Sequence, residues 1–342
     1  MRVAVVSAEG PGSPSLAVRT ELPASALRQR GVALEPRLLF DREQADRFAA
    51  GGLATKTAVA ARARRALRAN LAEEAGDFDA VLVHRRADPL PSLSVERAAR
   101  AGRRLVYDVD DALWHDRALK AGTRKSRWLA ERSDHVIAGN SILAEHLARH
   151  ANAVTVVPSL VDTERIEVRR HQASEELVLG WIGSRTTAPF VARLRPAIEQ
   201  LAGDLGGSRL RLLMVGGTTG RPAGVELESR PWSAEAQADA LRRMDVGVMP
   251  LPDTPWNRGK CAYKALQYMA AGVPVVADDV GVAGEVVGPG GVVGGEWREE
   301  LRELLLDPAL RGRVGAQGRA RVESGYSVAR WAPVLAEVIG GR

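Results

Sequence analysis

The chain has 342 residues, of which 45% are hydrophobic and 26% are charged, and these ordinary fractions exclude a mostly disordered, a collagen-like or a membrane-spanning protein. At roughly 100–200 residues per domain, the length predicts two domains. The 48 basic and 42 acidic residues leave a net charge of +6, but the arginines are interleaved with acidic residues and only 4% of the chain is aromatic. We therefore expect no nucleic-acid partner.

The sequence lacks the patterns of a secreted or membrane-anchored chain. Its first apolar run, residues 3–6, is too short for the core of a signal peptide. No stretch approaches the roughly 20 apolar residues of a membrane span. The single cysteine, Cys261, excludes an intrachain disulfide. We expect a cytoplasmic protein and leave a peripheral membrane contact open.

Short apolar runs alternate with segments of helical period in the first half of the chain. Continuous apolar runs are typical of strands buried on both faces of a parallel sheet, and their alternation with helices indicates βαβ units. The expected strands are 3–6, 80–84, 105–108, 135–138 and 154–157. The expected helices are 16–30, 56–75, 91–101, 117–131 and 140–150.

The same alternation restarts after a polar stretch at 158–176, which we interpret as a linker between domains. The expected strands of the second half are 177–182, 210–215, 225–228, 246–249 and 273–277, and the expected helices are 189–203, 233–243, 259–271, 296–307, 310–322 and 327–339. We predict an α/β fold of two Rossmann-like doubly wound domains that face each other across a cleft. Their predicted bounds are 1–165 and 172–325, and a C-terminal helix at 326–342 packs back towards the N-terminal domain.

Ligands of open α/β sheets lie beyond the carboxyl ends of the strands, and the loop after the first strand is the first candidate. It reads Glu-Gly-Pro-Gly-Ser-Pro-Ser at 9–15 and leads into a helix, whose start favours an anion. Ser15 stands where a dinucleotide fingerprint needs its third glycine. Two interpretations stay open: a surface turn, or a substrate-lining loop in which Gly12, Ser13 and Arg19 contact the ligand.

Charged residues follow two further strands of the first half. Asp108, Asp110 and Asp111 fall within four residues at a strand end, which is costly unless the carboxylates are solvated, paired or used. Asp110 or Asp111 could instead cap the following turn, and an Asp-x-Asp metal site is only weakly indicated. His84 and Arg85 end another strand, where they either hold a phosphate or acidic acceptor or lie in a solvated loop.

The first strand-to-helix turn of the second half reads Gly-Trp-Ile-Gly-Ser-Arg-Thr-Thr at 180–187. Gly183 lets a ligand approach the backbone, while Ser184 and Arg185 supply a hydroxyl and a cation. This composition fits a diphosphate, and a plain turn with a helix cap is the alternative.

The stretch 250–274 carries the most informative pattern. A helix over 259–271 would place Lys260, Lys264 and Gln267 on one face of an otherwise apolar helix. Like charges at i, i+4 repel each other and are tolerated most easily when an anion lies between them. The alternative is that both lysines extend their ammonium groups into solvent.

These motifs together resemble the retaining nucleotide-sugar glycosyltransferases of the two-Rossmann GT-B fold, particularly the large bacterial family four. The resemblance covers nearly the whole chain, and it rests on residues 105–114, 136–140, 156–162, 180–184, 245–251 and 264–277. It implies transfer of a sugar from a nucleoside diphosphate donor without a metal or other cofactor. The nucleotide would bind the C-terminal domain and the acceptor the N-terminal one.

Several positions depart from that family's pattern. The family usually carries two glutamates separated by seven residues, and Gly259 and Gln267 stand there instead. The resemblance assigns the ribose hydroxyls to Gln267, whose amide still donates and accepts hydrogen bonds. Asp108 stands in place of the usual strand-end histidine. The usual arginine and lysine of the Gly-Arg…Lys-Gly turn are absent, so the diphosphate would rely on Lys260, Lys264 and Arg185.

We therefore predict a metal-independent glycosyltransferase of the hexosyltransferase type that retains the anomeric configuration. Its acceptor would be a small molecule, a glycan or a lipid-linked molecule. The expected catalytic residues are Asp108, Lys260 and Lys264; the donor-binding residues are Gly183, Ser184, Arg185, Lys260, Lys264 and Gln267; the acceptor-binding residues are Gly12, Ser13, Arg19, His84, Arg85 and Asp111. The alternatives are a catalytically inactive nucleotide-sugar-binding partner subunit and a sugar-nucleotide epimerase of the same fold.

Overall fold

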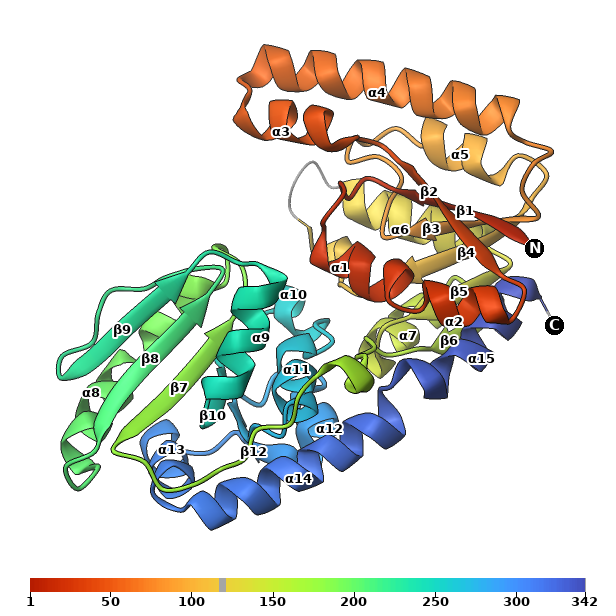
Figure 1. The fold of residues 1–342 in the computed structure, drawn as a ribbon. Coiled ribbons are helices and arrows are strands. Elements are labelled where there is room, and N and C mark those ends of the chain that lie inside the picture. The colour runs from red at the N-terminus through yellow and green to blue at the C-terminus, as the bar shows by residue number, and fades with distance from the viewer. Residues whose placement is uncertain (117–120, 342) are drawn as a thin grey trace. The chain divides into compact units, whose positions relative to one another are not determined.

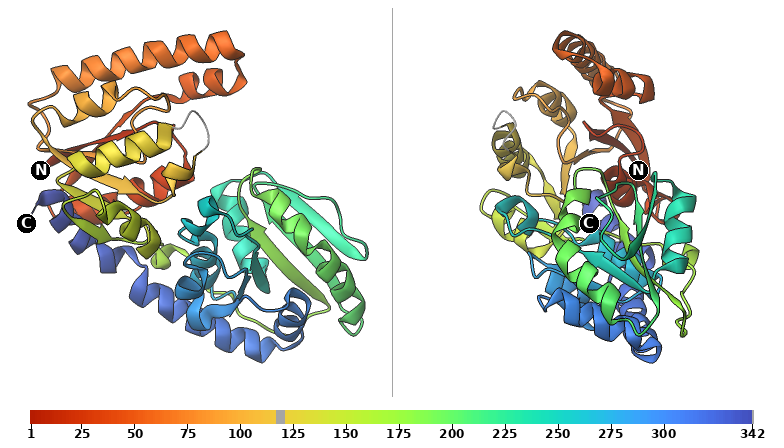
Figure 2. Two further views of the ribbon diagram at one scale, coloured as in Figure 1. Left: turned by 180° about the vertical axis from the view of Figure 1, so that it is seen from behind. Right: turned by 90° about the vertical axis from the view of Figure 1, so that its left-hand side faces the viewer.

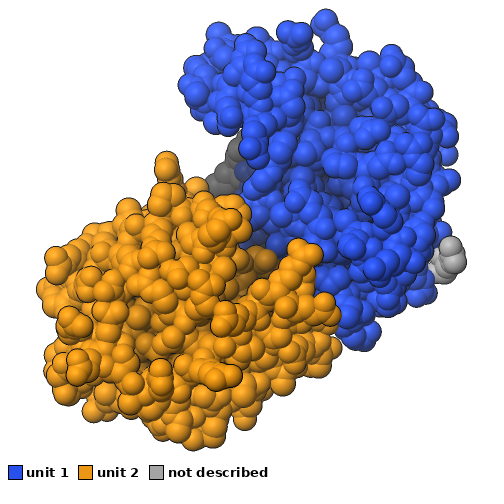
Figure 3. Space-filling view, in the orientation of Figure 1, with its two compact units in different colours: residues 1–160, 258–261, 328–342 blue, residues 161–257, 262–327 orange. Residues whose placement is uncertain are grey.

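The computed structural model describes residues 1–116 and 121–341 (Figure 1). Two compact units make up the chain and are coloured separately in Figure 3. The first comprises residues 1–160, 258–261 and 328–342, and the second comprises residues 161–257 and 262–327. Each unit contains one six-stranded sheet with helices around it, which confirms the predicted α/β fold of two doubly wound halves.

The first unit is built on a parallel sheet of order β2-β1-β3-β4-β5-β6. Its strands are β1 (Arg2–Ser7), β2 (Ala33–Leu38), β3 (Ala80–His84), β4 (Arg104–Val109), β5 (His135–Ala138) and β6 (Val154–Val156). Its helices are α1 (Pro14–Leu16), a π-helical turn (Ala17–Glu21), α2 (Ala24–Gln29), α3 (Arg42–Ala50), α4 (Leu53–Glu73), α5 (Ser94–Arg100), a 3-10 turn (Leu113–His115), α6 (Ala121–Arg132), α7 (Ser141–Ala148) and α15 (Val328–Gly340). The predicted helix at 117–131 begins with residues that lie outside the described part of the chain.

Strand β2 and helix α3 are absent from the predicted elements. The β2 sequence contains Pro36 and side chains that are only partly buried, so it shows no continuous apolar run. It lies at the edge of the sheet and pairs with β1 alone. An edge position tolerates a residue without an N–H, which explains why a strand forms there despite the proline.

Helix α15 completes the core of the first unit from the far end of the chain. Leu335, Val338 and Ile339 are buried in the same apolar cluster as Val3 and Val5 of strand β1. The helix is also held by polar contacts, because Nη2 of Arg104 donates to the carbonyl of Val338 at 2.9 Å. The first and the last segments of the chain therefore share one core.

The second unit has a parallel sheet of order β12-β11-β10-β7-β8-β9. Its strands are β7 (Glu176–Ile182), β8 (Arg209–Val215), β9 (Val225–Arg230), β10 (Val246–Met249), β11 (Val275–Ala277) and β12 (Gly291–Val293). Its helices are two 3-10 turns (Thr163–Arg165 and Ala188–Leu194), α8 (Arg195–Asp204), α9 (Ala234–Arg243), α10 (Pro255–Arg258), α11 (Tyr263–Ala270), α12 (Ala283–Val287), a third 3-10 turn (Gly288–Gly290), α13 (Trp297–Leu306) and α14 (Pro308–Gly325). Helices α8 and α9 cover opposite faces of this sheet (Figures 1 and 2).

The polar stretch interpreted as a linker is attached to the second unit rather than hanging free. The N–H of Arg169 donates to the carbonyl of Ala271 at 2.8 Å, and its guanidinium donates to Asp245 at 2.9 Å. His171 lies 2.9 Å from the carbonyl of Gly272. Charged side chains that read as solvated in the sequence are here the anchors of the segment.

None of the helices in the described ranges is both long and apolar enough to cross a membrane.

Candidate active site

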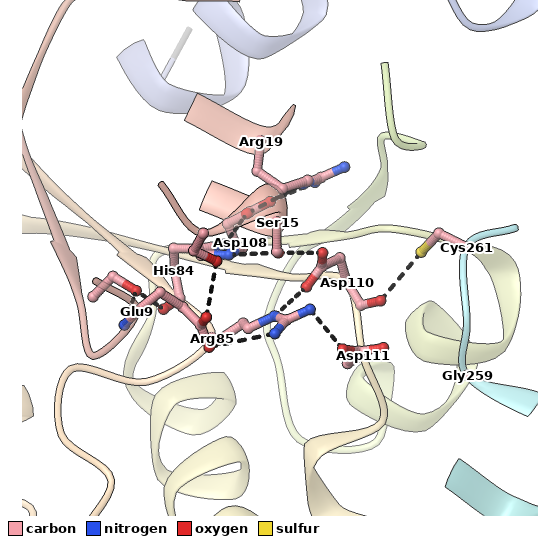
Figure 4. Close-up of polar contacts among 12 residues, drawn as sticks. Glu9, Ser15, Arg19, His84, Arg85, Asp108, Asp110, Asp111, Gly259 and Cys261 are labelled. Carbon is pink, nitrogen blue, oxygen red and sulfur yellow. Dashed lines mark hydrogen bonds and ion pairs between the residues drawn. The ribbon is translucent and has the colours of Figure 1, made fainter. Parts of the chain in front are cut away.

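The strand order of the first sheet changes direction between β1 and β3, and such a switch point leaves a crevice at the carboxyl ends of the two strands. Residues 9–15 follow β1, and His84 and Arg85 stand at the end of β3. Strand β4 is the next neighbour and ends near Asp108. Figure 4 shows the side chains that converge there.

Asp108 lies at the centre of this cluster and is buried, with 2% of its surface exposed. Its Oδ2 is 2.7 Å from Nδ1 of His84, and its Oδ1 accepts from Nε of Arg19 at 3.1 Å and from Nη2 of the same guanidinium (Figure 4). Burial opposes ionisation, but the charge of Arg19 and the contact with His84 outweigh it and hold the pKa of Asp108 below its usual value.

Arg19 is fully engaged within the first unit. Its Nη1 donates to the carbonyls of Val157 at 2.6 Å and Pro158 at 2.9 Å, in addition to the ion pair with Asp108. Burial opposes its charge, yet the neighbouring carboxylate raises the pKa of Arg19 above its ordinary value. The side chain that we expected to contact an acceptor thus positions Asp108 and the segment after β6.

Ser15 extends the cluster towards solvent. Its hydroxyl lies 2.9 Å from Nε2 of His84 and donates to Oδ2 of Asp110 at 2.5 Å. When the Ser15 proton points at Asp110, its oxygen can only accept from His84. With Asp108 on the other ring nitrogen, both nitrogens of His84 have a polar partner.

Arg85 connects three carboxylates of the same cluster. Its Nε donates to Asp110 at 2.6 Å, its Nη2 to Asp111 at 2.5 Å and its Nη1 to Glu9 at 3.3 Å (Figure 4). The backbone of Arg85 has a φ of 58°, in the left-handed region that costs a non-glycine residue on the order of 1 kcal/mol. The ion pairs hold the residue in this strained conformation.

The two neighbouring carboxylates respond to this surrounding in opposite directions. Burial disfavours the charge of Asp110, but Arg85 and His84 outweigh burial and lower its pKa. For Asp111, burial and the nearby Asp110 charge together prevail over Arg85 and Lys260, so its pKa is raised. Of these two carboxyl groups, Asp111 therefore takes up a proton more readily.

These contacts bear on the interpretation of His84 and Arg85 as an anion site. Each is already held by carboxylates: His84 by Asp108, and Arg85 by Glu9, Asp110 and Asp111. Negative charge thus surrounds both groups, and a phosphate or an acidic acceptor would have to displace it. The alternative of a solvated loop does not fit His84, because that residue is completely buried.

The loop residues of the acceptor prediction lie at the edge of the cluster. The hydroxyl of Ser13 donates to Glu9 at 2.9 Å, which in turn contacts Arg85. Gly12 has a φ of 82°, and no atom lies within 4 Å of where its Cβ would be. Its glycine is required by the backbone conformation and not by crowding.

Residues 258–261 join this cluster from a distant part of the sequence. Nζ of Lys260 donates to Oδ1 of Asp111 at 2.7 Å, and the thiol of Cys261 donates to the carbonyl of Asp110 at 3.3 Å. The amide of Asn140 donates to the carbonyl of Gly259 at 3.0 Å. Burial raises the pKa of Cys261 to about 12, so the thiol stays protonated.

The predicted helix over 259–271 is wrong in its first turn. Helix α10 ends at Arg258, and α11 begins at Tyr263 after Ala262, whose φ is 49°. Lys260 therefore precedes the helix, and it does not share a helix face with Lys264. Lys260 and Lys264 are therefore not an i, i+4 pair on one helix, and the anion predicted between them from that spacing is not required.

The donor-side residues gather at the carboxyl ends of β7 and β10, between which the strand order of the second sheet reverses. A Cβ on Gly183 would overlap the Trp181 ring and would lie 2.7 Å from Cε of Lys264. Nζ of Lys264 lies 5.6 Å from the centre of the Trp181 ring, within the range of a cation–π contact. The structure thus brings Gly183, which follows β7, next to Lys264, which lies in the first turn of α11.

The neighbouring turn is exposed. Ser184, Arg185 and Thr186 lie on the surface, and the hydroxyls of Ser184 and Thr186 are 2.7 Å apart. Gln267, in contrast to the residues of this turn, is buried. It lies on α11 and interacts with the hydroxyl of Tyr263. Burial raises the pKa of Tyr263 to about 12, which keeps that hydroxyl neutral.

Four residues of these clusters are absent from the predicted site residues: Glu9, Ser15, Asn140 and Trp181. A signal for Ser15 is present in the sequence, since it is a hydroxyl residue at the start of a helix that follows a strand. Trp181 was hidden within a buried strand. No group of three or more His, Cys, Asp or Glu side chains within residues 1–116 and 121–341 is arranged to hold a metal ion.

The family model described as "Glycosyl transferases group 1" matches residues 177–307, which belong to the second unit apart from 258–261. A search of curated protein sequences finds no match.

Solved structures share the fold over the whole chain. Sucrose-phosphate synthase from Thermosynechococcus elongatus is 14% identical with a TM-score of 0.71, and the match covers 99% of this chain and 98% of that one. HepE from Anabaena, solved in complex with UDP, is 15% identical with a TM-score of 0.69 and full coverage of both chains. WaaG, a glycosyltransferase involved in lipopolysaccharide biosynthesis, is 14% identical with a TM-score of 0.67 and full coverage of both chains.

Proposed function

We propose that this protein is a glycosyltransferase, since a group 1 glycosyl transferase model matches residues 177–307 and the fold is that of the GT-B neighbours. We propose that its donor diphosphate binds at the carboxyl ends of β7 and β10. The observation that carries this proposal is the position of Lys264 beside Gly183. Cε of Lys264 lies 2.7 Å from where a Cβ on Gly183 would stand, so the lysine supplies a cation at this strand end. Ser184 and Arg185 extend the site from the adjoining turn.

Leaving-group stabilisation is the chemistry that this arrangement supports. As the bond between the sugar and the diphosphate breaks, negative charge grows on the phosphate oxygens. Lys264 and the start of α11 present positive charge there before the reaction begins, so they favour the transition state over the ground state. We propose that this preorganised charge does the work that a metal ion does in other transferases, so the reaction needs none.

We propose that the sugar keeps its anomeric configuration. In a front-face reaction, the departing phosphate accepts the proton of the attacking acceptor hydroxyl, so no strong base is required. This fits the cluster of the first unit, where Asp108 is ionised and held by Arg19 and His84. Asp108 would orient neighbouring groups, and Asp111, whose pKa is raised, would exchange a proton more easily.

The crevice of the first unit is proposed to receive the acceptor. Carboxylates there are hydrogen-bond acceptors, and its cations are already paired, so hydroxyl groups are better suited to it than phosphates. Small polyols, glycans and lipid-linked sugars all offer such hydroxyls. Lys260 contacts this crevice through its ion pair with Asp111. We keep its contact with the donor as a proposal.

The test is a titration of UDP, GDP, dTDP and ADP against thermal unfolding, followed by assay of the corresponding nucleotide sugars. A ligand at about 100 times its dissociation constant adds roughly 2.7 kcal/mol of stability. We expect one diphosphate to raise the Tm in the presence of EDTA, and proton NMR of the product to show an unchanged anomeric configuration. Inversion would refute retention, and loss of activity in EDTA with rescue by Mn²⁺ would refute metal independence.

A second candidate is a catalytically inactive nucleotide-sugar-binding subunit, and one observation favours it. A Cβ on Gly259 would lie 2.5 Å from that of Ala112, so there is no room for a side chain at the position where the sequence resemblance implies a glutamate. Gln267 stands at the second such position. Donor binding without either transfer or hydrolysis, measured with a panel of acceptors, would identify this role.

A further inference from the structure

A cluster of arginines lies at the amino ends of the first unit's strands. Arg100 is the last residue of α5, Arg103 directly precedes β4, and Arg104 is the first residue of that strand. Together with Asp134 they line a pocket of about 410 Å³. Strand β4 rises roughly 13 Å between Arg104 and Asp108, at about 3.3 Å per residue. The pocket is therefore separate from the crevice at the carboxyl ends of the strands.

Arg103 is a buried cation of this cluster. Only 8% of its surface is exposed, and its Nη2 donates to the carbonyls of Leu71 at 3.0 Å and Ala98 at 2.8 Å. These carbonyls lie in the last turns of α4 and α5, so one nitrogen caps two helix ends. Nε and Nη1 are also buried, and they have no hydrogen-bond partner among the described residues. Burial lowers the pKa of Arg103, because its surroundings do not fully compensate the charge.

Two acidic residues near the arginines are engaged elsewhere. The charge of Glu74 acts on Arg103, but Oε2 of Glu74 accepts from Nε of Arg37 at 2.6 Å. Oδ2 of Asp134 accepts from a backbone N–H of β4 at 2.7 Å. The same oxygen lies 3.8 Å from Nη1 of Arg100, which is too long for a hydrogen bond. Positive charge is thus in excess at the pocket.

Arg104 adds a second cation that bonds to backbone. Its Nε donates to the carbonyl of Ile339 at 3.1 Å and its Nη2 to that of Val338 at 2.9 Å, both on α15. Burial and the charge of Arg104 together lower the pKa of His135, the first residue of β5. The positive field of the cluster therefore reaches the neighbouring strand.

We propose that this pocket binds a phosphate group, either as inorganic phosphate or as part of a phosphate monoester. The pocket combines three guanidiniums with one carboxylate, which leaves two positive charges. A phosphate group carries a charge of about −1.5 to −2 at neutral pH, and guanidinium donors match its oxygens in a planar fork. A bound anion also offsets the cost of burying Arg103 without a counter-charge.

Occupation of the pocket should stabilise the first unit. Arg104 joins the pocket to α15, whose apolar side chains complete the core of that unit. A ligand that binds only the folded chain shifts unfolding to a higher temperature. We therefore expect phosphate to raise the Tm at constant ionic strength, a condition that separates binding from general screening of charges by salt.

Calorimetric titration of inorganic phosphate and of glycerol 3-phosphate into the parent chain, Arg100→Ala, Arg100→Lys and Arg65→Ala tests the proposal. Arg100 is the residue to change, because its side chain is 39% exposed, whereas removal of Arg103 uncaps two helices. We expect Arg100→Ala to weaken binding roughly 10-fold, as for a lost hydrogen bond to a charged group. Arg100→Lys keeps the charge and should lose less. Arg65 is exposed on α4 of the same unit, so Arg65→Ala should equal the parent.

The Arg100 series is repeated in Lys264→Ala, which removes the cation proposed for the donor site. Phosphate should still bind in that background and should still depend on Arg100, even if the chain binds no nucleoside diphosphate. Binding of both probes would show that the phosphate group suffices, and binding of one alone would identify the free anion or the ester as the ligand. No saturable binding of either probe, equal binding by Arg100→Ala and the parent, or loss of binding in Lys264→Ala would overturn the inference.

Discussion

The amine of Lys260 lies 2.7 Å from Oδ1 of Asp111, although the two residues are separated by 149 positions in the sequence. Asp111 is nearly buried, whereas the Lys260 side chain keeps 32% of its surface exposed. The pair joins the segment 258–261 to a cluster that also contains Arg85 and Asp110. Two residues that we had assigned to donor and acceptor separately are thus one structural element.

Lys260→Ala should lower the free energy of unfolding by about 1–3 kcal/mol, because it leaves the buried Asp111 carboxylate with fewer partners. Adding Asp111→Asn removes the carboxylate charge that lost its lysine partner. The double variant should therefore recover part of the loss, and urea unfolding of the full mutant cycle measures the coupling. Strict additivity of the two single changes would show that the pair contributes nothing.

Lys264→Ala should lose diphosphate binding and turnover together. Hydrogen bonds to charged groups contribute about 1.5–3 kcal/mol, which is roughly 10- to 150-fold in kcat/KM. Calorimetric titration alongside initial rates is the measurement. Lys56→Ala is the lysine control, since Lys56 lies on α4 of the other unit; Lys120, which would have served, lies outside the described residues. Undiminished binding by Lys264→Ala would remove this lysine from the site.

Arg85→Ala should destabilise the protein more than Arg85→Gly does. Both variants lose the contacts to Glu9, Asp110 and Asp111, but only alanine keeps a Cβ at the φ of 58°. Relief of that strain should favour glycine by about 1 kcal/mol. Chemical unfolding of both variants at pH 7 gives the comparison, and an order reversed in favour of alanine would mean that the backbone relaxes when the guanidinium is removed.

Asp108→Asn should cost about 3–5 kcal/mol of stability at neutral pH, because it breaks a buried ion pair with Arg19. The folded pKa of Asp108 lies below its usual value, so the unfolded chain binds this proton first as the pH falls. The stabilisation is complete above about pH 4 and is lost as the pH falls through the folded pKa. Unfolding curves from pH 7 to 2 should show the parent approaching the variant.

The same variant tests the proposed catalytic role. Turnover should fall more than donor affinity, because Asp108 belongs to the unit proposed to bind the acceptor. Measurements belong at a temperature where Asp108→Asn is still folded. Normal turnover there would leave Asp108 with a structural role only.

Sequence patterns were sufficient for the central strands and failed where burial is incomplete. Strands such as β3 and β4 are buried on both faces and read as continuous apolar runs. The edge strand β12 is short and half-buried, so it has no such run. The helix break before α11 depends on the left-handed conformation of Ala262. An alanine does not indicate that conformation in a sequence, so the break could not be predicted.

The candidate sites were predictable as regions more than as contacts. Gly183 and Lys264 belong to separate strand-to-helix connections, and the strand order brings them together as the motifs suggested. The pairing of Asp108 with Arg19 could not be foreseen, because it depends on the register of β1 and β4 on either side of β3. Charges that read as free in the sequence were neutralised by partners from other strands.

The shared core of β1 and α15 has a consequence for synthesis of the chain. Val3 is translated long before Leu335 and Ile339, which belong to the same apolar cluster. The second unit, at 161–257 and 262–327, needs none of these residues and can fold earlier. Nascent chains stalled before residue 328 should therefore expose the first unit to chaperones and proteases while the second is already resistant, although the first unit is translated first.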